Sequence, residues 1–97
     1  NRITEHVRQI TPYLEKKLDE LAGNYDFIET RRGSGLMQGL VCRGAVGDII
    51  TRAMEKGLIL INAGTSILRF VPPLIITEEH VDEMTDILNR ILSEEER

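Results

Sequence analysis

The sequence of 97 residues has few aromatic side chains and no excess of positive charge. It contains two Tyr, two Phe and no Trp, and 16 Asp and Glu outnumber 12 Lys and Arg, which gives a formal net charge of -4. Proteins that bind nucleic acid usually carry a basic surface and aromatic side chains that stack on bases. The composition therefore argues against a DNA- or RNA-binding module.

Cysteine and long apolar runs are also scarce. The one cysteine, Cys42, excludes an internal disulfide, cannot form a zinc site alone, and favours a reducing compartment, so we expect a cytoplasmic location. No apolar run approaches the roughly 20 residues of a membrane-spanning helix. The N-terminus lacks the pattern of a secretory signal, and the first residue is not Met. We therefore expect either a mature product or a piece of a longer protein.

The rest of the composition is that of an ordinary globular protein. Hydrophobic residues make up 41% of the chain and charged residues 29%, which excludes intrinsic disorder. A chain of this size buries roughly 60–70% of the surface that its unfolded form exposes. We expect one domain over residues 1–97 with a modest hydrophobic core.

Three segments have the apolar spacing of a helix with one buried face. The first runs from Ile3 to Leu21 and is expected to end at Gly23-Asn24, with Gly23 at positive φ. Pro12 either kinks this helix or begins a new one capped by Thr11, and the unbroken apolar phase favours one kinked helix.

The other two predicted helices are shorter or lie at the C-terminal end. One spans residues 46–54, with its apolar face including Met54, and ends at Lys56 and Gly57. The last begins after a Thr77 cap, followed by acidic residues that complement the helix dipole. Its apolar face consists of Val81, Met84, Leu88, Ile91 and Leu92, and residues 93–97 form a solvated tail.

Four segments have the composition of strands. Residues 25–32 and 36–42 are expected to form a hairpin through a three-residue Gly33-Ser34-Gly35 turn. Gly39, inside the second strand, predicts that a neighbouring group approaches the backbone closely there. The continuous apolar run 58–61 indicates a central strand. Residues 67–71 form a strand that Pro72-Pro73 stops.

The predicted element order is therefore α-β-β-α-β-β-α. This order indicates an α+β fold in which helices pack on an antiparallel or mixed sheet of three to four strands.

Most residues that could carry chemistry have a simpler structural interpretation. Gly33-Ser34-Gly35 lacks a full phosphate-binding pattern and is better explained as a hairpin turn. The single thiol ends an apolar strand, so a buried, inert cysteine is expected. The histidines lie on helix surfaces, and no lysine is in the apolar setting that favours a Schiff base. The residues set aside on these grounds are Cys42, His6, His80, Lys16, Lys17 and Lys56.

Arg69 is the residue with the strongest indication of a function. Strand alternation places it on one face with Ile67 and Val71, where a guanidinium without a partner would be costly. One interpretation is that this face is open to water or that Glu29 pairs with the arginine, as is common for strand arginines. The other is that Arg69 binds the carboxylate of a ligand, because its planar guanidinium matches a carboxylate.

Several segments together resemble a known family. In order, they are the hairpin segment 32–39 (RGSGLMQG), the helix end 57–60 (GLIL), the strand segment 68–74 (LRFVPPL) and the helix start 76–79 (ITEE). This series is similar to the C-terminal small domain of class III pyridoxal-phosphate aminotransferases. The resemblance covers essentially the whole chain.

The resemblance implies a domain of a dimeric fold-type I enzyme. That enzyme would transfer an amino group to 2-oxoglutarate, with N-acetylornithine as the favoured donor in arginine biosynthesis. Arg69 would hold the substrate carboxylate, while Gly33, Gly35, Pro72 and Pro73 would shape the backbone around it. The site predicted in this chain is thus Arg69 alone, with no catalytic, cofactor-binding or metal-binding residue.

The same resemblance implies that the chain is a fragment. Pyridoxal 5'-phosphate needs a Schiff-base lysine, an acidic partner for its ring nitrogen and a phosphate-binding site. In this class, those groups come from the large domain and the second subunit. We therefore expect the isolated chain neither to bind the cofactor tightly nor to transaminate.

Other functions fit the sequence as well. Within the class, the donor could be ornithine, succinylornithine or 4-aminobutyrate. Outside it, the chain could be a non-catalytic α+β module that binds a small acidic ligand at Arg69, or a dimerisation domain whose apolar helix faces pack on a partner.

Overall fold

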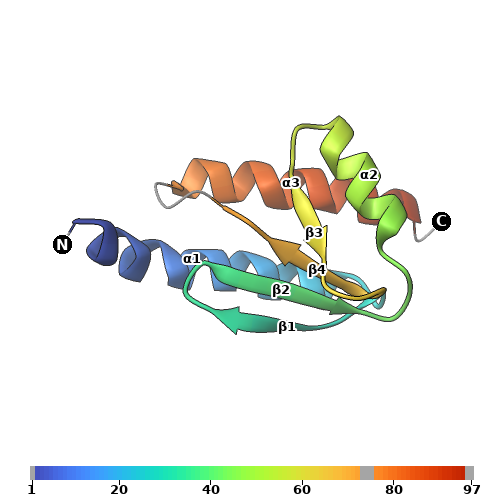
Figure 1. Ribbon diagram of the computed structural model, residues 1–97, viewed down its shortest axis with the longest axis horizontal. Coiled ribbons are helices and arrows are strands. Elements are labelled where there is room, and N and C mark those ends of the chain that lie inside the picture. Colours follow the sequence, from blue (N-terminus) through green and yellow to red (C-terminus); the bar gives the residue numbers. More distant parts are fainter. Residues whose placement is uncertain (1, 73–75, 96–97) are drawn as a thin grey trace.

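The computed structural model describes residues 2–72 and 76–95 and has the predicted element order α-β-β-α-β-β-α (Figure 1). Within this part of the chain, three helices pack on a four-stranded sheet, so the predicted α+β class is confirmed. The elements are α1 (Arg2–Asn24), β1 (Ile28–Ser34), β2 (Met37–Cys42), α2 (Gly47–Glu55), β3 (Leu60–Asn62), β4 (Ile67–Phe70) and α3 (Glu78–Glu95).

The sheet is antiparallel throughout its described strands, in the order β1-β2-β4-β3. β3 is therefore an edge strand, and the prediction of a central strand over 58–61 was wrong. The burial pattern explains the wrong prediction: Leu58 and Leu60 are buried, whereas Ile59 and Ile61 are exposed. The continuous apolar run has one face on the core and one face outside it.

The hairpin between β1 and β2 is tighter than predicted. Ser34 pairs with Met37, so Gly35 and Leu36 form a two-residue turn, and Gly33 lies within β1. Gly35 has a φ of 58° and supplies the left-handed backbone of the turn. Gly33 has a φ of 142°, and a Cβ there would lie 2.1 Å from the Met37 carbonyl oxygen. Both glycines are needed, but only one is in the turn.

Strand β1 also begins later than expected. The predicted strand began at Tyr25, yet the observed one begins at Ile28. The Tyr25 hydroxyl donates a hydrogen bond to the Asn89 carbonyl on α3, 2.9 Å away, so this residue links the helices instead of pairing in the sheet. An aromatic side chain has strand propensity, but here a tertiary contact decides its position.

Helix α1 continues through Pro12, as the unbroken apolar phase predicted. The Thr11 hydroxyl donates to the Val7 carbonyl 2.6 Å away, one turn earlier, so Thr11 does not cap a new helix. The predicted end at Gly23-Asn24 is confirmed, but Gly23 lies inside the helix and is not among the positive-φ residues, contrary to expectation. The helix ends at Asn24.

The ends of α2 and α3 largely agree with the sequence. Gly57, with a φ of 89°, follows α2, and the Thr77 hydroxyl accepts the His80 amide hydrogen at the start of α3. Met54 is exposed, although it was expected on the apolar face of α2. Strand β4 ends at Phe70, one residue earlier than predicted. Pro73, Leu74 and residues 96–97, for which the sequence also made predictions, lie outside the described residues.

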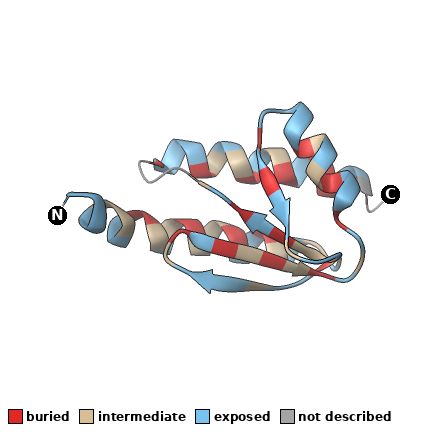
Figure 2. Ribbon diagram, viewed as in Figure 1, coloured by how far each residue is buried: buried red, intermediate tan, exposed pale blue. Residues whose placement is uncertain are grey.

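The two faces of the sheet differ sharply. α1 and α3 pass behind the sheet in Figure 1, and α2 packs on α3 and β3. We call the helix-packed side the covered face and the other side the open face; along β2 the residues alternate between them (Figure 2). Buried residues of the covered face are Gln38, Leu40, Cys42, Leu60, Leu68 and Phe70. Exposed or half-buried residues of the open face are Arg32, Met37, Gly39, Val41, Ile61, Ile67 and Arg69.

No helix within residues 2–72 and 76–95 combines the length and apolar composition that crossing a bilayer requires.

Candidate functional site

Arg69 lies on the open face of β4, between two buried neighbours. Leu68 is 0% exposed and Phe70 is 3% exposed, whereas Arg69 is exposed. Strand alternation alone predicted this orientation. The residues directly opposite Arg69 are Gly39 on β2 and Ile61 on β3. The guanidinium therefore projects from the open face with a glycine on one side and an aliphatic side chain on the other.

A second arginine lies in the same row. Arg32 on β1 is directly opposite Gly39, so Arg32, Gly39 and Arg69 are aligned across three adjacent strands. We call these three residues the arginine row. Gly39 has no side chain, and a Cβ there would lie 3.1 Å from the Leu68 carbonyl oxygen. The close neighbour predicted at Gly39 is thus confirmed, and nothing on β2 separates the two arginines.

The arginine row borders a shallow hollow of about 290 Å³ on the open face. Its lining combines two guanidinium groups with apolar side chains, and none of its lining residues is acidic. A hollow of this kind suits a small anion that carries some hydrocarbon. The lining residues are Arg32, Gly33, Met37, Gln38, Gly39, Val41, Ala63, Ile67 and Arg69.

Neither arginine of the row has an internal partner within the described residues. Glu29, considered as a partner of Arg69, forms no ion pair with it, and all five ion pairs in residues 2–72 and 76–95 involve other groups. No hydrogen bond from Arg32 or Arg69 side chains occurs there either. The two guanidinium groups are thus available to an anion from outside this part of the chain.

Arg31, next in sequence to Arg32, has the opposite environment. Its Nε donates to Asp19 Oδ1 at 2.7 Å, and its Nη1 lies 3.2 Å from Glu15 Oε2 on the same helix. Nη1 also donates to Oε1 of the buried Gln38 at 2.8 Å. The hydrogen bond to Asp19 raises the pKa of Arg31 above its usual value. Arg31 therefore joins α1 to the sheet.

Cys42 has the structural role predicted from the sequence. It is buried at the end of β2, and burial raises the pKa of its thiol to about 11. A thiol with this pKa is a poor nucleophile near neutral pH.

The histidines differ from each other more than expected. His80 is exposed, and its Nδ1 accepts the Thr77 amide hydrogen at 3.2 Å. His6 is half-buried, and its Nε2 makes a short hydrogen bond with the Ile76 carbonyl oxygen. The expectation that both histidines are exposed was wrong for His6, because α1 packs against the chain leading into α3. No group of three or more His, Cys, Asp or Glu in the described residues is arranged to hold a metal ion.

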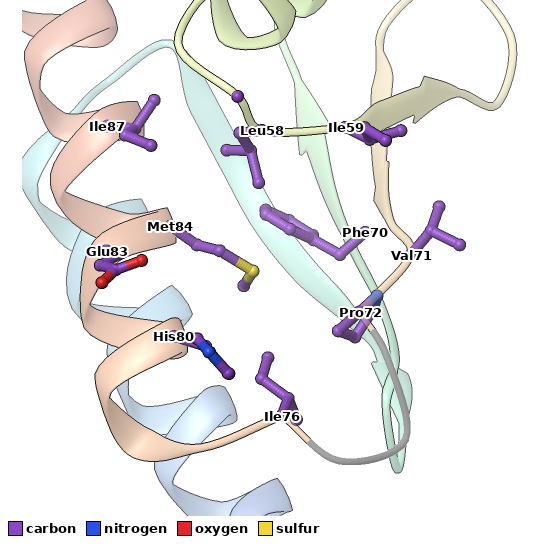
Figure 3. Close-up of a pocket in the computed structure, with 11 residues that line it drawn as sticks. Leu58, Ile59, Phe70, Val71, Pro72, Ile76, His80, Glu83, Met84 and Ile87 are labelled. Carbon is purple, nitrogen blue, oxygen red and sulfur yellow. The ribbon is translucent and has the colours of Figure 1, made fainter.

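A second cavity, of about 280 Å³, lies between α3 and the ends of β3 and β4 (Figure 3). Leu58, Phe70 and Met84 point into it, so its lining is mostly apolar. His80 and Glu83 are its polar side chains, both from α3. It lacks the converging polar groups that orient a small ligand.

The lysines of the described residues lie away from the hollow beside the arginine row. A covalent attachment site for pyridoxal phosphate needs a lysine that faces the ligand cavity. Lys16 and Lys56 are exposed, and Lys17 lies 3.9 Å from both Glu20 and Asp82. No lysine lines the hollow beside the arginine row.

Comparison with known proteins agrees with the motifs found in the sequence. The acetylornithine aminotransferase of Caldanaerobacter subterraneus subsp. tengcongensis is 41% identical over 83 residues, which is 84% of this chain and 21% of that protein. The solved N-acetylornithine aminotransferase of Stenotrophomonas maltophilia K279a matches with a TM-score of 0.84 and 31% identity, over 95% of this chain and 26% of that one. The lysine aminotransferase of M. tuberculosis matches with a TM-score of 0.88 and 26% identity, over 94% of this chain and 22% of that one.

The chain thus spans about a fifth to a quarter of the length of these relatives. The resemblance to class III aminotransferases is confirmed by a family model, described as "Aminotransferase class-III", that matches residues 1–92. Because this match extends over nearly all of the sequence, the chain belongs to the class III aminotransferase family.

Proposed function

We propose that residues 1–97 form the C-terminal small domain of a longer pyridoxal-phosphate-dependent aminotransferase. In that enzyme, Arg69 binds a carboxylate of the amino donor and of 2-oxoglutarate. Support comes from the family match and from the share of the relatives' length that this chain covers. The large domain and the second subunit would supply the groups that this chain lacks.

The observation that carries the proposal is the environment of Arg69. The guanidinium is exposed on the open face, has no internal partner among the described residues, and borders a hollow with apolar walls. Covering this face with a second domain would remove water from the hollow and strengthen the attraction between guanidinium and carboxylate. A planar guanidinium can hold a carboxylate through two hydrogen bonds, which fixes its orientation.

The chain's contribution to the reaction is therefore binding and orientation. Pyridoxal phosphate supplies the electron-withdrawing chemistry of amino-group transfer in such enzymes. Arg69 would hold the substrate by its carboxylate, and Met37, Val41 and Ile67 would contact the adjacent carbons. Fixing one end of the substrate in this way converts binding energy into correct placement of the reacting end.

The proposed donor is N-acetylornithine, which would place the enzyme in arginine biosynthesis. Support comes from the name of the similar protein of Caldanaerobacter subterraneus subsp. tengcongensis and from the Stenotrophomonas structure. The fold does not select the donor, because a lysine aminotransferase matches with a comparable TM-score. Ornithine, succinylornithine and 4-aminobutyrate are the alternatives to test beside it.

The test is to express the complete product of the gene and measure transamination. We expect a product several times longer than this chain that transfers the amino group of N-acetylornithine to 2-oxoglutarate more efficiently than that of the other three donors. Preference for another of these donors would replace the proposed substrate but keep the class. A complete product of only 97 residues, or no transamination with any donor, would refute the proposed function.

A further inference from the structure

We propose that His6 and His80 clamp the peptide group between Ile76 and Thr77 at the start of α3, and that protonation of His80 releases one side of this clamp. Sequence spacing indicates no role for either histidine, because the two lie near opposite ends of the chain. The fold brings both rings to the polar atoms of one peptide group. They form a pH-sensitive device that is separate from the hollow beside the arginine row.

The two histidines reach the peptide group from different helices. His6 lies on α1, and its Nε2 makes a short hydrogen bond with the Ile76 carbonyl oxygen. His80 lies in the first turn of α3, and its Nδ1 accepts the Thr77 amide hydrogen at 3.2 Å. Because this carbonyl and this amide belong to the same peptide bond, one planar group is held on both sides.

On the α3 side, the contact is half of a reciprocal helix cap. The Thr77 carbonyl oxygen accepts the Val81 amide hydrogen at 3.0 Å, which makes Thr77 the N-cap residue. Its hydroxyl accepts the His80 amide hydrogen at 3.2 Å, and His80 Nδ1 accepts the Thr77 amide hydrogen in return. Glutamate or glutamine usually has the second role in such a capping box. An imidazole there makes the cap depend on pH, whereas a glutamine amide does not titrate.

The two contacts need different protonation states. A ring nitrogen that accepts a hydrogen bond carries no proton, so His80 holds Thr77 only while its ring is neutral with the proton on Nε2. Protonation of Nδ1 places a donor against the Thr77 amide, and that hydrogen bond is lost. His6 donates from Nε2, which carries a proton in the neutral Nε2–H form and in the charged form. Histidine rings ordinarily become charged as the pH falls from 8 to 5, so acid breaks the His80 contact and keeps the His6 contact.

Glu83 provides a partner for His80 once the ring is charged. It lies in the next turn of α3, and both side chains line the cavity of Figure 3. Side chains one turn apart on a helix are neighbours, so a charged imidazole and this carboxylate attract each other. A positive charge near the N-terminal end of a helix is otherwise unfavourable. Falling pH therefore moves the His80 ring away from Thr77 and toward Glu83.

The other described groups around the clamp do not replace the lost contact. Beside His6, the hollow between α1 and the start of α3 has one charged lining residue, Glu78, whose carboxylate is compatible with a charged ring. Glu79 lies in the first turn of α3, and Asp82 is bonded to Tyr13 of α1. None of the residues that line the cavity from the side of β3 and β4 is titratable: Gly57, Leu58, Ile59, Phe70, Val71 and Pro72.

The test is NMR of the 97-residue chain as the pH is lowered from about 8 to about 5. Ring nitrogen shifts give the protonation state of each histidine, and exchange with solvent gives the protection of the Thr77 amide. At the higher pH we expect the His80 ring to be neutral with its proton on Nε2. Protection of the Thr77 amide, corrected for the intrinsic pH dependence of exchange, should then fall about fivefold, as expected for loss of one capping hydrogen bond. The fall should follow the titration of the His80 ring.

Two matched variants separate the histidines. His80→Gln keeps an acceptor for the Thr77 amide at every pH, so protection of this amide should stay constant over the same range. His6→Gln keeps a donor for the Ile76 carbonyl oxygen and should leave the pH response of Thr77 unchanged. His80 is exposed and His6 is half-buried, so both variants should stay folded, which circular dichroism at each pH would verify.

Several results would overturn the proposal. A His80 ring that carries its proton on Nδ1 at the higher pH could not accept the Thr77 amide hydrogen. A Thr77 amide whose protection is independent of pH, or a pH response that persists in His80→Gln, would show that His80 does not control the cap. Loss of the response in His6→Gln would assign the control to His6 instead. These measurements contain no cofactor or substrate, so their result does not depend on whether the complete enzyme transaminates.

Discussion

The neighbouring residues Arg31 and Arg32 lie on opposite faces of the sheet and have opposite environments. On the covered face, Arg31 contacts Asp19, Glu15 and Gln38, whereas on the open face Arg32 has no partner in the described chain. A charge brought close to helices must be neutralised within the fold, because desolvation is costly. A charge left on an exposed face has no such requirement. The difference shows which arginines stabilise this fold and which are free to bind something else.

Apolar residues show the same contrast. Leu40 and Leu68 are fully buried on the covered face, while Met37 is 73% exposed and Ile61 is 49% exposed on the open face. Several large apolar side chains beside unpaired arginines are unusual for a surface that faces only water. In the proposed enzyme, the rest of the protein would cover much of this face and enclose the hollow.

The largest expected effect tests whether Arg69, on the open face, binds substrate. In the complete enzyme, Arg69→Ala should lower kcat/KM for 2-oxoglutarate and for the amino donor. The loss should correspond to roughly 2–5 kcal/mol of transition-state stabilisation, because a desolvated carboxylate loses its charged partner. Arg69→Lys should recover only part of the loss, since an ammonium cannot reproduce the two hydrogen bonds of a guanidinium. Steady-state kinetics would measure both. Unchanged kinetics in both variants would make Arg69 an ordinary surface arginine.

The next effect compares neighbouring apolar residues of β2. Leu40→Ala should lower the free energy of unfolding by about 3 kcal/mol, because it leaves a cavity in the core between sheet and helices. Val41→Ala, on the open face, should cost less than about 1 kcal/mol, because its side chain is only half-buried. Urea unfolding of the 97-residue chain would give both values. Equal losses would mean that the open face is packed within the chain, and the distinction between the faces would fail.

Much of this contrast could be predicted from local sequence. Alternation in Leu68-Arg69-Phe70 placed the arginine on one face of the strand and its two core neighbours on the other, because successive side chains in a strand point to opposite faces. The position of β3 at the edge could not be predicted in this way, since strand order depends on pairing between distant segments. For the same reason, the position of Arg32 beside Arg69 could not be predicted from local sequence. Its alignment with Arg69 depends on the two-residue turn at Gly35-Leu36, which sets the register of β1 on β2.

A third prediction compares the reactivity of a thiol on each face of the sheet. With its pKa raised to about 11, Cys42 should have about 100-fold less thiolate near pH 8 than a thiol with a pKa of 9.0. Iodoacetamide should therefore modify Cys42 about 100-fold more slowly than the exposed thiol of a Met37→Cys, Cys42→Ala variant. Mass spectrometry over time would measure both rates, and 6 M urea should make them similar. Rapid modification of Cys42 in the folded chain would show that the covered face opens to solvent.

The smallest expected effect returns to the adjacent arginines. Arg31→Gln should lower the free energy of unfolding by about 1 kcal/mol, because it removes a partly exposed ion-pair network, and the loss should shrink at high salt. Arg32→Gln should change stability by less than about 0.5 kcal/mol, as expected for a surface residue without partners. Urea unfolding at low and high salt would compare the two. If Arg32→Gln were as destabilising as Arg31→Gln, Arg32 would have a structural role within the chain, and the contrast between the two faces would fail.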